Sequence, residues 1–504
     1  MSRFSALLAG ALLTALALPA APAQAAAPDP DVVAATDAGP VHGSAHDGYR
    51  TFQGIPYAAP PTGDLRWRDP QPVTPWSGVR EATAPGNRCP QGTTGDEDCL
   101  YLNVTAPAGA ERRPVVVWLH GGSFTGGAGS DYDPHRMAVD GDVVVVTVNY
   151  RLGIYGYFGY PGLAGSGDFG LADQQAALRW VRRNAAAFGG DPANVTLAGQ
   201  SAGGMSVCSQ LTSPSAEGLF DKAIIQSGSC LIDYPKALFW PTIPAGSPWT
   251  GRTAVETAGS GLGTTLGCAD IACLRGKPAA ELAGHLGEFA KPAYDTPLLP
   301  AEPAQALRDG RFHRVPVLQG GNRDEHRSFV AVLDKMQPIT EQRYHDLLAQ
   351  SFGAQADAVA ERYPASDYPS PAVAWATVAT DRIWSCPTLQ SDRLLARHTP
   401  VYTYEFADRG APAPPGLPAG FPYGAYHASE LPYLFDVAGL PATLDPGQQR
   451  LADRMIHSWT RFATTGHPWS RFDDGEARSL APGEGARTVD LEDEHNCDLW
   501  LQDS

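Results

Sequence analysis

The chain is long and acidic, with 504 residues, a formal net charge of −17 at pH 7 and a pI near 5.1. Nucleic acids and anionic membranes attract basic surfaces, so this charge argues against both as partners. The length is above the usual size of one domain, although large α/β enzymes reach it as a single unit.

The first residues have the pattern of a secretory signal peptide. Arg3 precedes an apolar run over residues 6–18, and the small-residue site Ala23–Ala25 follows. This run is too short to span a bilayer, and no run of about eighteen apolar residues comes later. We therefore expect residues 1–26 to be removed and residues 27–504 to be secreted as an extracellular protein without a membrane span.

The cysteine usage fits an exported protein. The eight cysteines are an even number, and none stands in a C-x-x-C pair. In an exported chain this usage indicates disulfide bonds rather than a zinc site. Spacing alone does not say which cysteines pair.

Apolar strand-like runs alternate with helical patterns along most of the chain. Strands are predicted over Val115–Leu119, Val143–Val148, Val195–Ala198, Lys222–Gln226, Val315–Gln319 and Val401–Phe406, and helices over Leu171–Phe188 and Ala202–Leu211. This alternation predicts an α/β fold with a mainly parallel sheet and helices on both faces. The Pro- and Gly-rich stretch Gly410–Gly416 predicts an insertion loop, and residues 27–504 are expected to form one domain.

The segment Gly199–Gly203 contains the clearest catalytic motif of the sequence. It fits the pattern G-x-S-x-G, with a predicted strand before it and a predicted helix after it. A sharp strand-to-helix turn would lift the Ser201 hydroxyl above the sheet edge, and glycine at 199 and 203 would let the strand and helix approach each other. Ser201 is therefore predicted to be a nucleophile.

A serine hydroxyl needs a general base, and the base needs a carboxylate that orients it. In this type of fold the order along the chain is serine, acid, histidine, each just past a strand end. The acid is expected after Val315–Gln319, where spacing does not choose between Asp324 and Glu325. The base is expected after Val401–Phe406, where His427 is one candidate among the thirteen histidines of the chain.

The negative charge that develops during attack needs hydrogen-bond donors. The N–H of Ala202, directly after the nucleophile, is one candidate. The Gly-rich loop that begins at His120 after the strand Val115–Leu119 supplies others. We expect His120 to be a structural residue of this loop rather than a second base.

Three further segments, Phe52–Ala58, Glu97–Val104 and Ala187–Pro192, complete a resemblance that spans nearly the whole mature sequence. With them the chain resembles the type-B carboxylesterases, the carboxylesterase/cholinesterase branch of the α/β-hydrolases. The resemblance implies an α/β-hydrolase fold with a mostly parallel central sheet and large loop insertions around an active-site gorge. It implies a secreted serine esterase that hydrolyses carboxylic esters of small molecules through an acyl-enzyme, without metal or cofactor.

The resemblance also implies residue roles. Ser201 would be the nucleophile, Glu325 the triad acid and His427 the base, with Asp324 a structural neighbour. The oxyanion would be held by the amides of Gly122, Ser123 and Ala202. The implied disulfides are Cys89 with Cys99, Cys268 with Cys273, and Cys386 with Cys497, whereas Cys208 and Cys230 are left either paired or free.

Three positions depart from the family pattern. Gln200 stands where Glu is usual, and the loop between Cys89 and Cys99 encloses only about nine residues. Both argue against choline esters, because they remove a negative charge and an aromatic platform, and the short loop also argues against a lidded lipase. His326 stands where glycine is usual, either as a surface residue or as a competitor for Glu325.

Two alternatives remain. A lipase acting on long-chain acylglycerols would use the insertion at residues 410–422 to cover its gorge, with Phe421, Tyr423 and Tyr426 lining the gorge or packing beneath the loop. A non-catalytic binding protein on the same scaffold would typically lack triad residues. The sequence indicates neither the physiological ester nor the oligomeric state.

Overall fold

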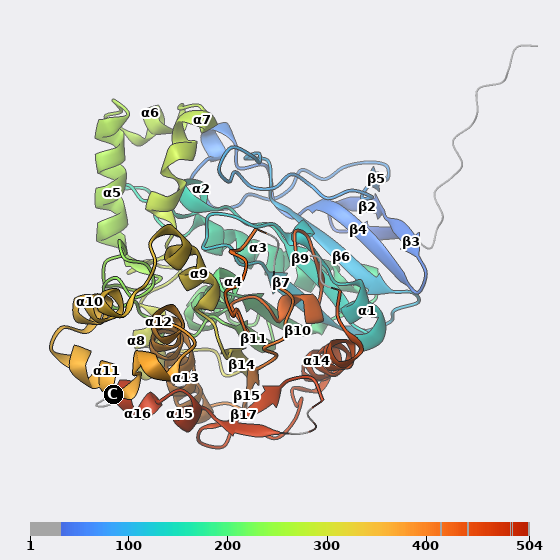
Figure 1. Cartoon of the computed structure of the whole chain (residues 1–504). Coiled ribbons are helices and arrows are strands. Elements are labelled where there is room, and N and C mark those ends of the chain that lie inside the picture. The colour runs from blue at the N-terminus through green and yellow to red at the C-terminus, as the bar shows by residue number, and fades with distance from the viewer. Residues whose placement is uncertain (1–31, 414–415, 441–442, 484, 486, 502–504) are drawn as a thin grey trace, which may run out of the picture.

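The computed structural model describes residues 32–413, 416–440, 443–483, 485 and 487–501, and an eleven-stranded sheet runs through its centre (Figure 1). In sheet order the strands are β18 (Thr488–Asp490), β17 (Glu476–Leu480), β15 (Val401–Phe406), β14 (Val317–Asn322), β11 (Lys222–Gln226), β10 (Gly190–Gln200), β7 (Arg113–Leu119), β9 (Val144–Val148), β6 (Tyr101–Pro107), β4 (Tyr49–Pro56) and β3 (Ser44–His46). The expected signal peptide, residues 1–26, lies outside the described residues.

The sheet is parallel in its middle and antiparallel at both edges. From β17 to β9 every neighbouring pair of strands is parallel. The antiparallel pairs are β17–β18 at one edge and β9–β6, β6–β4 and β4–β3 at the other. The predicted α/β fold with a mostly parallel central sheet is therefore confirmed. A smaller sheet of β1 (Val33–Thr36), β2 (Gly39–His42) and β5 (Arg80–Glu81) accompanies it.

The central strand β7 shows why helices cover both faces. Its residues are almost all apolar and buried, and they alternate between two hydrophobic cores. Val115, Val117 and Leu119 join the core that contains residues of α3 (Phe169–Asn184) and α4 (Ala202–Thr212). Val116 and Trp118 join the core formed with α1 (His135–Gly141) and α14 (Pro446–Thr465).

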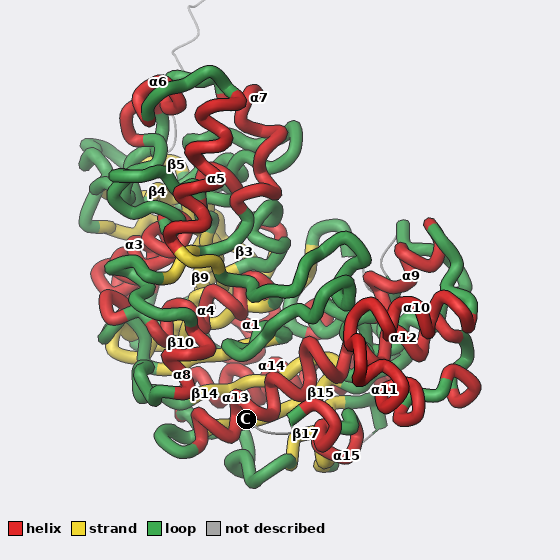
Figure 2. The backbone as a smooth tube through the Cα atoms, turned by 90° about the vertical axis from the view of Figure 1, so that its left-hand side faces the viewer, coloured by secondary structure: helices red, strands yellow, loops and turns green. Residues whose placement is uncertain are grey.

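The remaining helices belong mainly to the insertions predicted around the site. They are α2 (Gly153–Tyr157), α5 (Arg252–Thr265), α6 (Ile271–Arg275), α7 (Ala279–Leu282), α8 (Pro303–Arg308), α9 (Arg327–Met336), α10 (Glu341–Phe352), α11 (Ala356–Arg362), α12 (Pro371–Ala379), α13 (Cys386–Ala396), α15 (Leu491–Glu494) and α16 (Cys497–Trp500). Both ribbon views show α5, α6 and α7 standing apart from α10, α11 and α12 (Figures 1 and 2). Residues between β11 and β14 make the first group, and residues between β14 and β15 make the second.

Most predicted element bounds are close to the observed ones, but β10 is much longer than the strand predicted over Val195–Ala198, and one helix is too long. β11 and β15 have the predicted bounds. The helix predicted over Leu171–Phe188 is too long, because α3 ends at Asn184 and the next four residues form a tighter 3-10 turn. That turn closes at Gly189 with φ 84°, where a Cβ would lie 2.1 Å from the carbonyl oxygen of Ala110, so only glycine fits.

All eight cysteines are paired. The structure contains the disulfides Cys89–Cys99, Cys208–Cys230, Cys268–Cys273 and Cys386–Cys497. The second of these decides the question that the sequence left open, and it joins α4 to the segment after β11. The described part of the chain thus contains no free cysteine.

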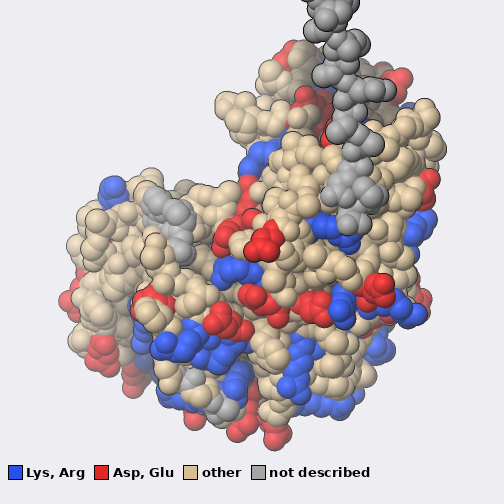
Figure 3. Space-filling view, turned by 90° about the vertical axis from the view of Figure 1, so that its right-hand side faces the viewer, with Lys and Arg blue, Asp and Glu red and all other residues tan. Residues whose placement is uncertain are grey.

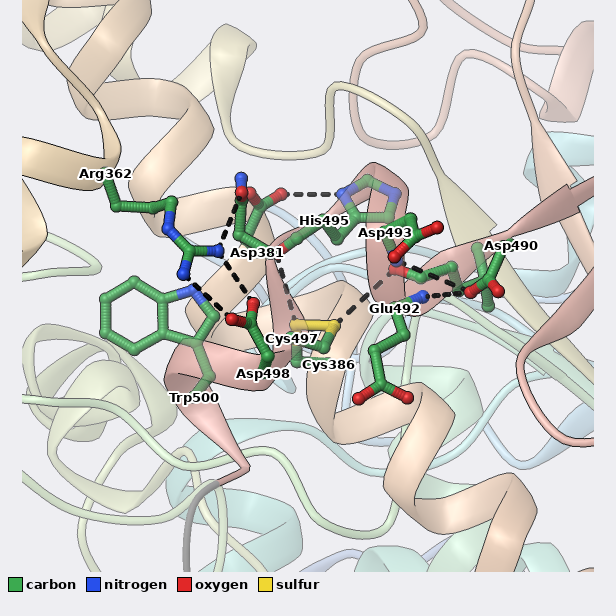
Figure 4. The surroundings of a disulfide bond; sticks show 12 residues. Arg362, Asp381, Cys386, Asp490, Glu492, Asp493, His495, Cys497, Asp498 and Trp500 are labelled. Carbon is green, nitrogen blue, oxygen red and sulfur yellow. Dashed lines mark hydrogen bonds and ion pairs between the residues drawn. A yellow bond between two sulfur atoms is a disulfide. The ribbon is translucent and has the colours of Figure 1, made fainter.

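The C-terminal segment is fastened to the fold by a disulfide and by a buried histidine (Figure 4). His495 lies between two carboxylates, with its Nδ1 2.6 Å from Asp381 Oδ1 and its Nε2 2.6 Å from Glu405 Oε1. All three side chains are buried. We call this group the His495 cluster. It borders a cavity of about 20 Å³ that Glu325 also lines, so the cluster lies directly behind the candidate triad acid.

The surface carries charges of both signs. In the space-filling view, Lys and Arg lie beside Asp and Glu across the middle and lower parts of the molecule (Figure 3). Over the described ranges no helix is both long and apolar enough to cross a membrane. The same residues include no group of three or more His, Cys, Asp or Glu placed to hold a metal ion.

Candidate active site

Ser201 stands between the end of β10 and the start of α4. Its backbone has φ 57° and ψ −122°, a conformation that costs about 1–3 kcal/mol and persists only where the surroundings fix it. The Ser201 N–H donates to the carbonyl of Gln226 in β11 at 2.9 Å, and the Ser201 carbonyl accepts from Met205 N–H in α4 at 2.9 Å. The strand and helix predicted on either side of Ser201 are confirmed, and bonds to both hold the turn.

The two glycines of the motif allow the close approach that the sequence predicted. A Cβ on Gly199 would lie 2.5 Å from the carbonyl carbon of Gly203, and a Cβ on Gly203 would lie 2.0 Å from the carbonyl oxygen of Leu119. Real Cβ atoms do not come this close to backbone atoms. The ends of β7 and β10 and the first turn of α4 therefore pack together only with glycine at these positions.

The loop after β7 lies against the Ser201 turn. A Cβ on Gly121 would be 2.9 Å from the Gln200 carbonyl oxygen and 3.1 Å from Ser201 Cβ. Gly122 and Ser123, with φ of 112° and 54°, then turn the chain through the left-handed region. The loop thus brings the backbone of Gly121 beside Ser201, just before the N-terminus of α4, where helical N–H groups have no partner within the helix.

His120 is part of the loop's support. Its ring is buried and stacks on Tyr150 with 4.3 Å between centroids, and the Tyr150 hydroxyl donates to the His120 carbonyl at 2.6 Å. Burial lowers the pKa of His120 to about 4, so the ring is neutral at neutral pH. These contacts agree with the structural role expected for His120.

The structure joins Glu325 to His427. Glu325 follows β14 and is fully buried, and its Oε2 lies 2.6 Å from His427 Nδ1. Its other oxygen accepts from the Asn322 N–H at 2.8 Å, and its carbonyl accepts from the His427 N–H at 3.1 Å. Burial alone would lower the pKa of His427, but the adjacent Glu325 carboxylate holds that pKa above its ordinary value.

The other ring nitrogen of His427 faces the Ser201 turn. Its Nε2 lies 3.3 Å from the Nε2 of Gln200, the residue directly before Ser201. Because the Nδ1–H donates to Glu325, the Nε2 lone pair accepts from the Gln200 amide. Gln200, one of the departures from the family pattern, thus lies beside the ring nitrogen that would act as the base.

Asp324, the alternative acid, has other partners. It pairs with Arg327 at 2.8 Å and with Arg409 at 3.0 Å, and it accepts from the Ala425 N–H at 3.0 Å. Two arginines and a backbone donor satisfy this carboxylate, whereas Glu325 is bonded to the candidate base. The structure thus separates the two acids that spacing alone left open.

The expectation that His326 is a surface residue or a competitor for Glu325 is wrong. His326 is fully buried, its Nδ1 accepts from the Trp384 indole N–H at 3.2 Å, and its Nε2 donates to the Phe239 carbonyl at 3.0 Å. Both ring nitrogens are therefore engaged away from Glu325. The sequence could not reveal this, because the bonded partners lie 58 and 87 residues away along the chain.

Sequence reasoning also missed Glu430, a second buried carboxyl group near the base. Its oxygens accept from Asn322 Nδ2 at 2.6 Å and from Gln226 Nε2 at 3.2 Å. Burial, and next the Glu325 carboxylate, raise the pKa of Glu430 to about 7. Its position three residues after His427 was the only available signal.

The aromatic residues of the insertion pack beneath it. The Tyr423 hydroxyl donates to the Pro418 carbonyl at 2.6 Å, and the Tyr426 hydroxyl donates to the Pro412 carbonyl at 2.8 Å. Phe421 packs against the same small cluster. Of the two arrangements that the sequence left open, the structure shows packing beneath the loop.

The short disulfide loop supports the Gly-rich loop. Between Cys89 and Cys99, the Gln91 side chain donates to the Gly127 carbonyl at 3.0 Å and accepts from the Gly127 N–H at 2.9 Å. These two bonds fix the far side of the turn that begins at Gly121. The disulfide therefore stiffens the backbone beside Ser201.

Together these groups have the parts of a nucleophilic site. A buried carboxylate holds one nitrogen of an imidazole, and the other nitrogen faces a strained serine turn. Such a pair removes a proton from a hydroxyl and returns it to a leaving group. Backbone amides beside the serine are suited to hold an oxyanion.

Known proteins are similar to this chain in sequence and in fold. The sequence matches the model of the Carboxylesterase family over residues 29–481. It is 36% identical over 510 residues to a fumonisin B1 esterase of Sphingopyxis macrogoltabida, covering 92% of this chain and 88% of that protein. It is 34% identical to the para-nitrobenzyl esterase of Bacillus subtilis, covering 86% and 90%. A solved structure of a PNB esterase has a TM-score of 0.77 at 30% identity and covers 94% of this chain and 100% of its own.

Proposed function

Because the chain belongs to the carboxylesterase family and is a carboxylic ester hydrolase, we propose that it works through an acyl-enzyme formed on Ser201, with His427 as base and Glu325 as triad acid. The observation that supports these roles best is the 2.6 Å bond between Glu325 Oε2 and His427 Nδ1. It fixes the tautomer of the imidazole so that its Nε2 lone pair faces the Ser201 turn.

The chemistry follows from these positions. His427 Nε2 takes the proton of the Ser201 hydroxyl while the oxygen attacks the ester carbonyl carbon. The N–H groups of Gly122, Ser123 and Ala202 hold the oxyanion, and loss of one such donor typically costs roughly a hundred- to thousand-fold in rate. The imidazolium then protonates the leaving alcohol, and water, activated by the same nitrogen, hydrolyses the acyl-enzyme.

We propose a small carboxylic ester as the substrate. The disulfide Cys89–Cys99 closes a short loop that carries no lid, and the aromatic residues of the 410–422 insertion are engaged in packing beneath it. Gln200 brings no negative charge that would attract a choline ester. These features favour short acyl chains over long-chain acylglycerols.

The test is hydrolysis of p-nitrophenyl acetate, butyrate, octanoate and palmitate by the wild type and by Ser201→Ala. We expect activity to fall from the short to the long esters and to vanish in Ser201→Ala. Ser366→Ala, at an exposed position, is the matched serine control and should keep wild-type rates. Turnover at the wild-type rate by Ser201→Ala would disprove the assigned nucleophile, and a preference for palmitate would favour the lipase.

A binding protein on the same scaffold is the other alternative, and a fluorophosphonate probe discriminates it. The probe reacts with an activated serine, so it should label the wild type and leave Ser201→Ala unlabelled. An unlabelled, inactive wild type would favour the binding protein.

We further propose that residues 1–26 direct export and that residues 27–504 form a single secreted catalytic domain. The four disulfides support an oxidising environment. Mass spectrometry of the protein recovered outside the cell should give a chain that begins at residue 27. Recovery of the uncleaved chain inside the cell would contradict this assignment.

A further inference from the structure

His326 and the aromatic rings around it form a group that the proposed mechanism does not use. His326 follows the candidate acid Glu325 directly and precedes α9. Its backbone N–H donates to Thr380 Oγ1 at 3.0 Å, and its ring nitrogen accepts from Trp384 Nε1 at 3.2 Å. Both partners lie in the π-helical segment Thr380–Ser385 between α12 and α13. Such wide turns are frequent at functional sites.

The contacts fix the chemical state of the His326 ring. An indole nitrogen only donates, so the Trp384 N–H requires a lone pair on His326 Nδ1. A carbonyl only accepts, so the Phe239 oxygen requires a proton on Nε2. Burial also lowers the pKa of His326 to about 3. The ring is therefore neutral, and it hydrogen-bonds the Trp384 indole on one side and the Phe239 backbone on the other.

Two of the rings that His326 holds also contact the candidate base. The Trp384 ring lies 4.8 Å from the His427 ring, and the Phe329 ring lies 5.4 Å from it, between centroids. The His326 ring itself packs on Phe329 at 5.0 Å. Glu325 binds one edge of His427, and the aromatic pair flanks the ring. Trp384 and Phe329 are thus two aromatic side chains that a charged His427 would meet besides its hydrogen-bond partners.

We propose that His326 is a positioning residue of the hydrolytic reaction: it holds Trp384 and Phe329 against His427, so that the base stays aligned with Ser201 and its cationic form is stabilised. This inference rests on the proposed function, since it assigns His427 as the base. Aromatic rings attract a nearby cation through their π-electrons. An imidazolium forms as Ser201 attacks, so the two rings act when the proton is on His427.

The departure from the family pattern makes this arrangement a property of this chain. The resemblance places glycine at position 326, and glycine has no side chain that could reach the Trp384 indole. The titratable groups that influence His427 are Glu325 and Glu430, and His326 lies close enough for its charged form to oppose that of His427. The His326 ring is neutral and is bonded to neither carboxyl group, so a change at His326 leaves the two carboxyl groups in place and alters the aromatic contacts.

Three variants test the proposal. His326→Leu fills the site but accepts no hydrogen bond, Trp384→Phe keeps a ring but loses the N–H, and His326→Asn keeps an acceptor for the indole. We expect the first two to lower kcat on p-nitrophenyl acetate by roughly ten- to a hundred-fold with little change in KM, because a misaligned base loses this much. His326→Asn should recover most of the rate. His345→Leu, on the exposed side of α10, is the control.

The pH profile is the readout that a merely structural role would not move. Without the aromatic contacts the cationic form of His427 is less stable, so the acid limb of kcat/KM should move to lower pH by about 0.5. Since His326→Leu and Trp384→Phe break the same hydrogen bond, the double variant His326→Leu/Trp384→Phe should lose little more than His326→Leu alone.

An unchanged kcat and acid limb in the two single variants, or losses that multiply in the double variant, would overturn the proposal. If His326→Leu fails to fold, the other two variants test the proposal. Trp384→Phe should then lower kcat, and His326→Asn should keep most of it. Fluorophosphonate labelling separates this result from the proposed function. If the wild type is labelled at Ser201 and His326→Leu is labelled at the same rate, only the positioning role is rejected. If the wild type is not labelled, the assigned triad is rejected.

Discussion

Gln200 places a neutral amide at the nitrogen of His427 that we propose takes the serine proton. In the resting state the amide donates to the Nε2 lone pair at 3.3 Å. Once His427 is protonated, two donors face each other, so the Gln200 side chain has to turn its oxygen toward the ring or move aside. In the observed orientation the amide thus bonds the neutral base, and it has to reorient before it can bond the cation.

Replacing Gln200 by Glu should reverse this preference. A carboxylate beside His427 raises its pKa, because an opposite charge favours the protonated ring. A base with a raised pKa is protonated to a higher pH, so the acid limb of kcat/KM should move to higher pH by about 1. Rates on p-nitrophenyl acetate across pH 5 to 9 check this, with Gln200→Met as the neutral control. An acid limb at the wild-type pH in Gln200→Glu would show that the side chain at 200 does not reach the base.

At this scale the sequence predicts the nucleophile better than its partners. Ser201 could be proposed from the sequence alone because every element of its motif lies within five residues. His427 and Glu325 are 102 residues apart, and only the fold brings them together. Asp324 and Glu325 are neighbours, so no spacing distinguishes them, and the resemblance supplied the choice. The role proposed for His326 depends on the Trp384 indole and the Phe239 carbonyl, 58 and 87 residues away, and leaves no pattern in the sequence.

At the level of elements, three backbone segments meet without side chains between them. Gly199 in β10, Gly203 in α4 and Leu119 at the end of β7 approach so closely that a Cβ would overlap with backbone atoms. A backbone cannot rotate away as a side chain does. The positions of the nucleophile turn and of the Gly-rich loop are therefore coupled through this contact.

Gly203→Ala should expose that coupling. Its Cβ would lie 2.0 Å from the Leu119 carbonyl oxygen, so α4 and β7 would have to separate. We expect kcat to fall by roughly a hundred-fold, since displacements of about 1 Å at a site have this effect. Gly261→Ala in α5, where a Cβ meets nothing within 4 Å, is the matched control. It should keep the activity and gain about 0.5–1 kcal/mol of stability. Rates and thermal unfolding measure both, and normal activity in Gly203→Ala would refute the coupling.

The sequence predicts the central parallel strands well, because they are continuous apolar runs buried on both faces. It does not predict the antiparallel edges. β3 and β18 are short and largely exposed, and they exist because longer strands pair with them. The end of α3 was also misplaced, because residues 185–188 contain no helix-breaking residue and the glycine stop at Gly189 closes the 3-10 turn rather than α3.

For the whole molecule, the His495 cluster joins segments that are far apart in the chain. His495 carries a charge between Asp381 and Glu405, and although burial would lower its pKa, the two carboxylates raise it to about 10. The ordinary pKa of histidine is 6.5, so the folded protein binds this proton more tightly than the unfolded chain. The stabilisation is therefore complete below about pH 6.5 and is lost as the pH rises toward 10.

We expect the free energy of unfolding of the wild type to decrease between pH 7 and pH 10. His495→Gln should be less stable by roughly 3–5 kcal/mol at neutral pH, because it leaves two buried carboxylates without a cation. The triple variant His495→Gln/Asp381→Asn/Glu405→Gln is the uncharged control and should lack this decrease. Urea unfolding at pH 7, 8.5 and 10, with the disulfides intact, measures the three proteins. A wild type with the same slope as the triple variant would contradict the charged state of His495.

A ribosome makes the chain from the N-terminus, so the carboxylates of the His495 cluster are made before His495 itself. His495 follows Asp381 by 114 residues and Glu405 by 90. While the growing chain is still attached, the two carboxylates that the finished core buries have no cation, and Cys386 has no sulfur to pair with. We therefore expect the sheet region around β14 and β15 to reach its final packing only after the C-terminal segment has been made.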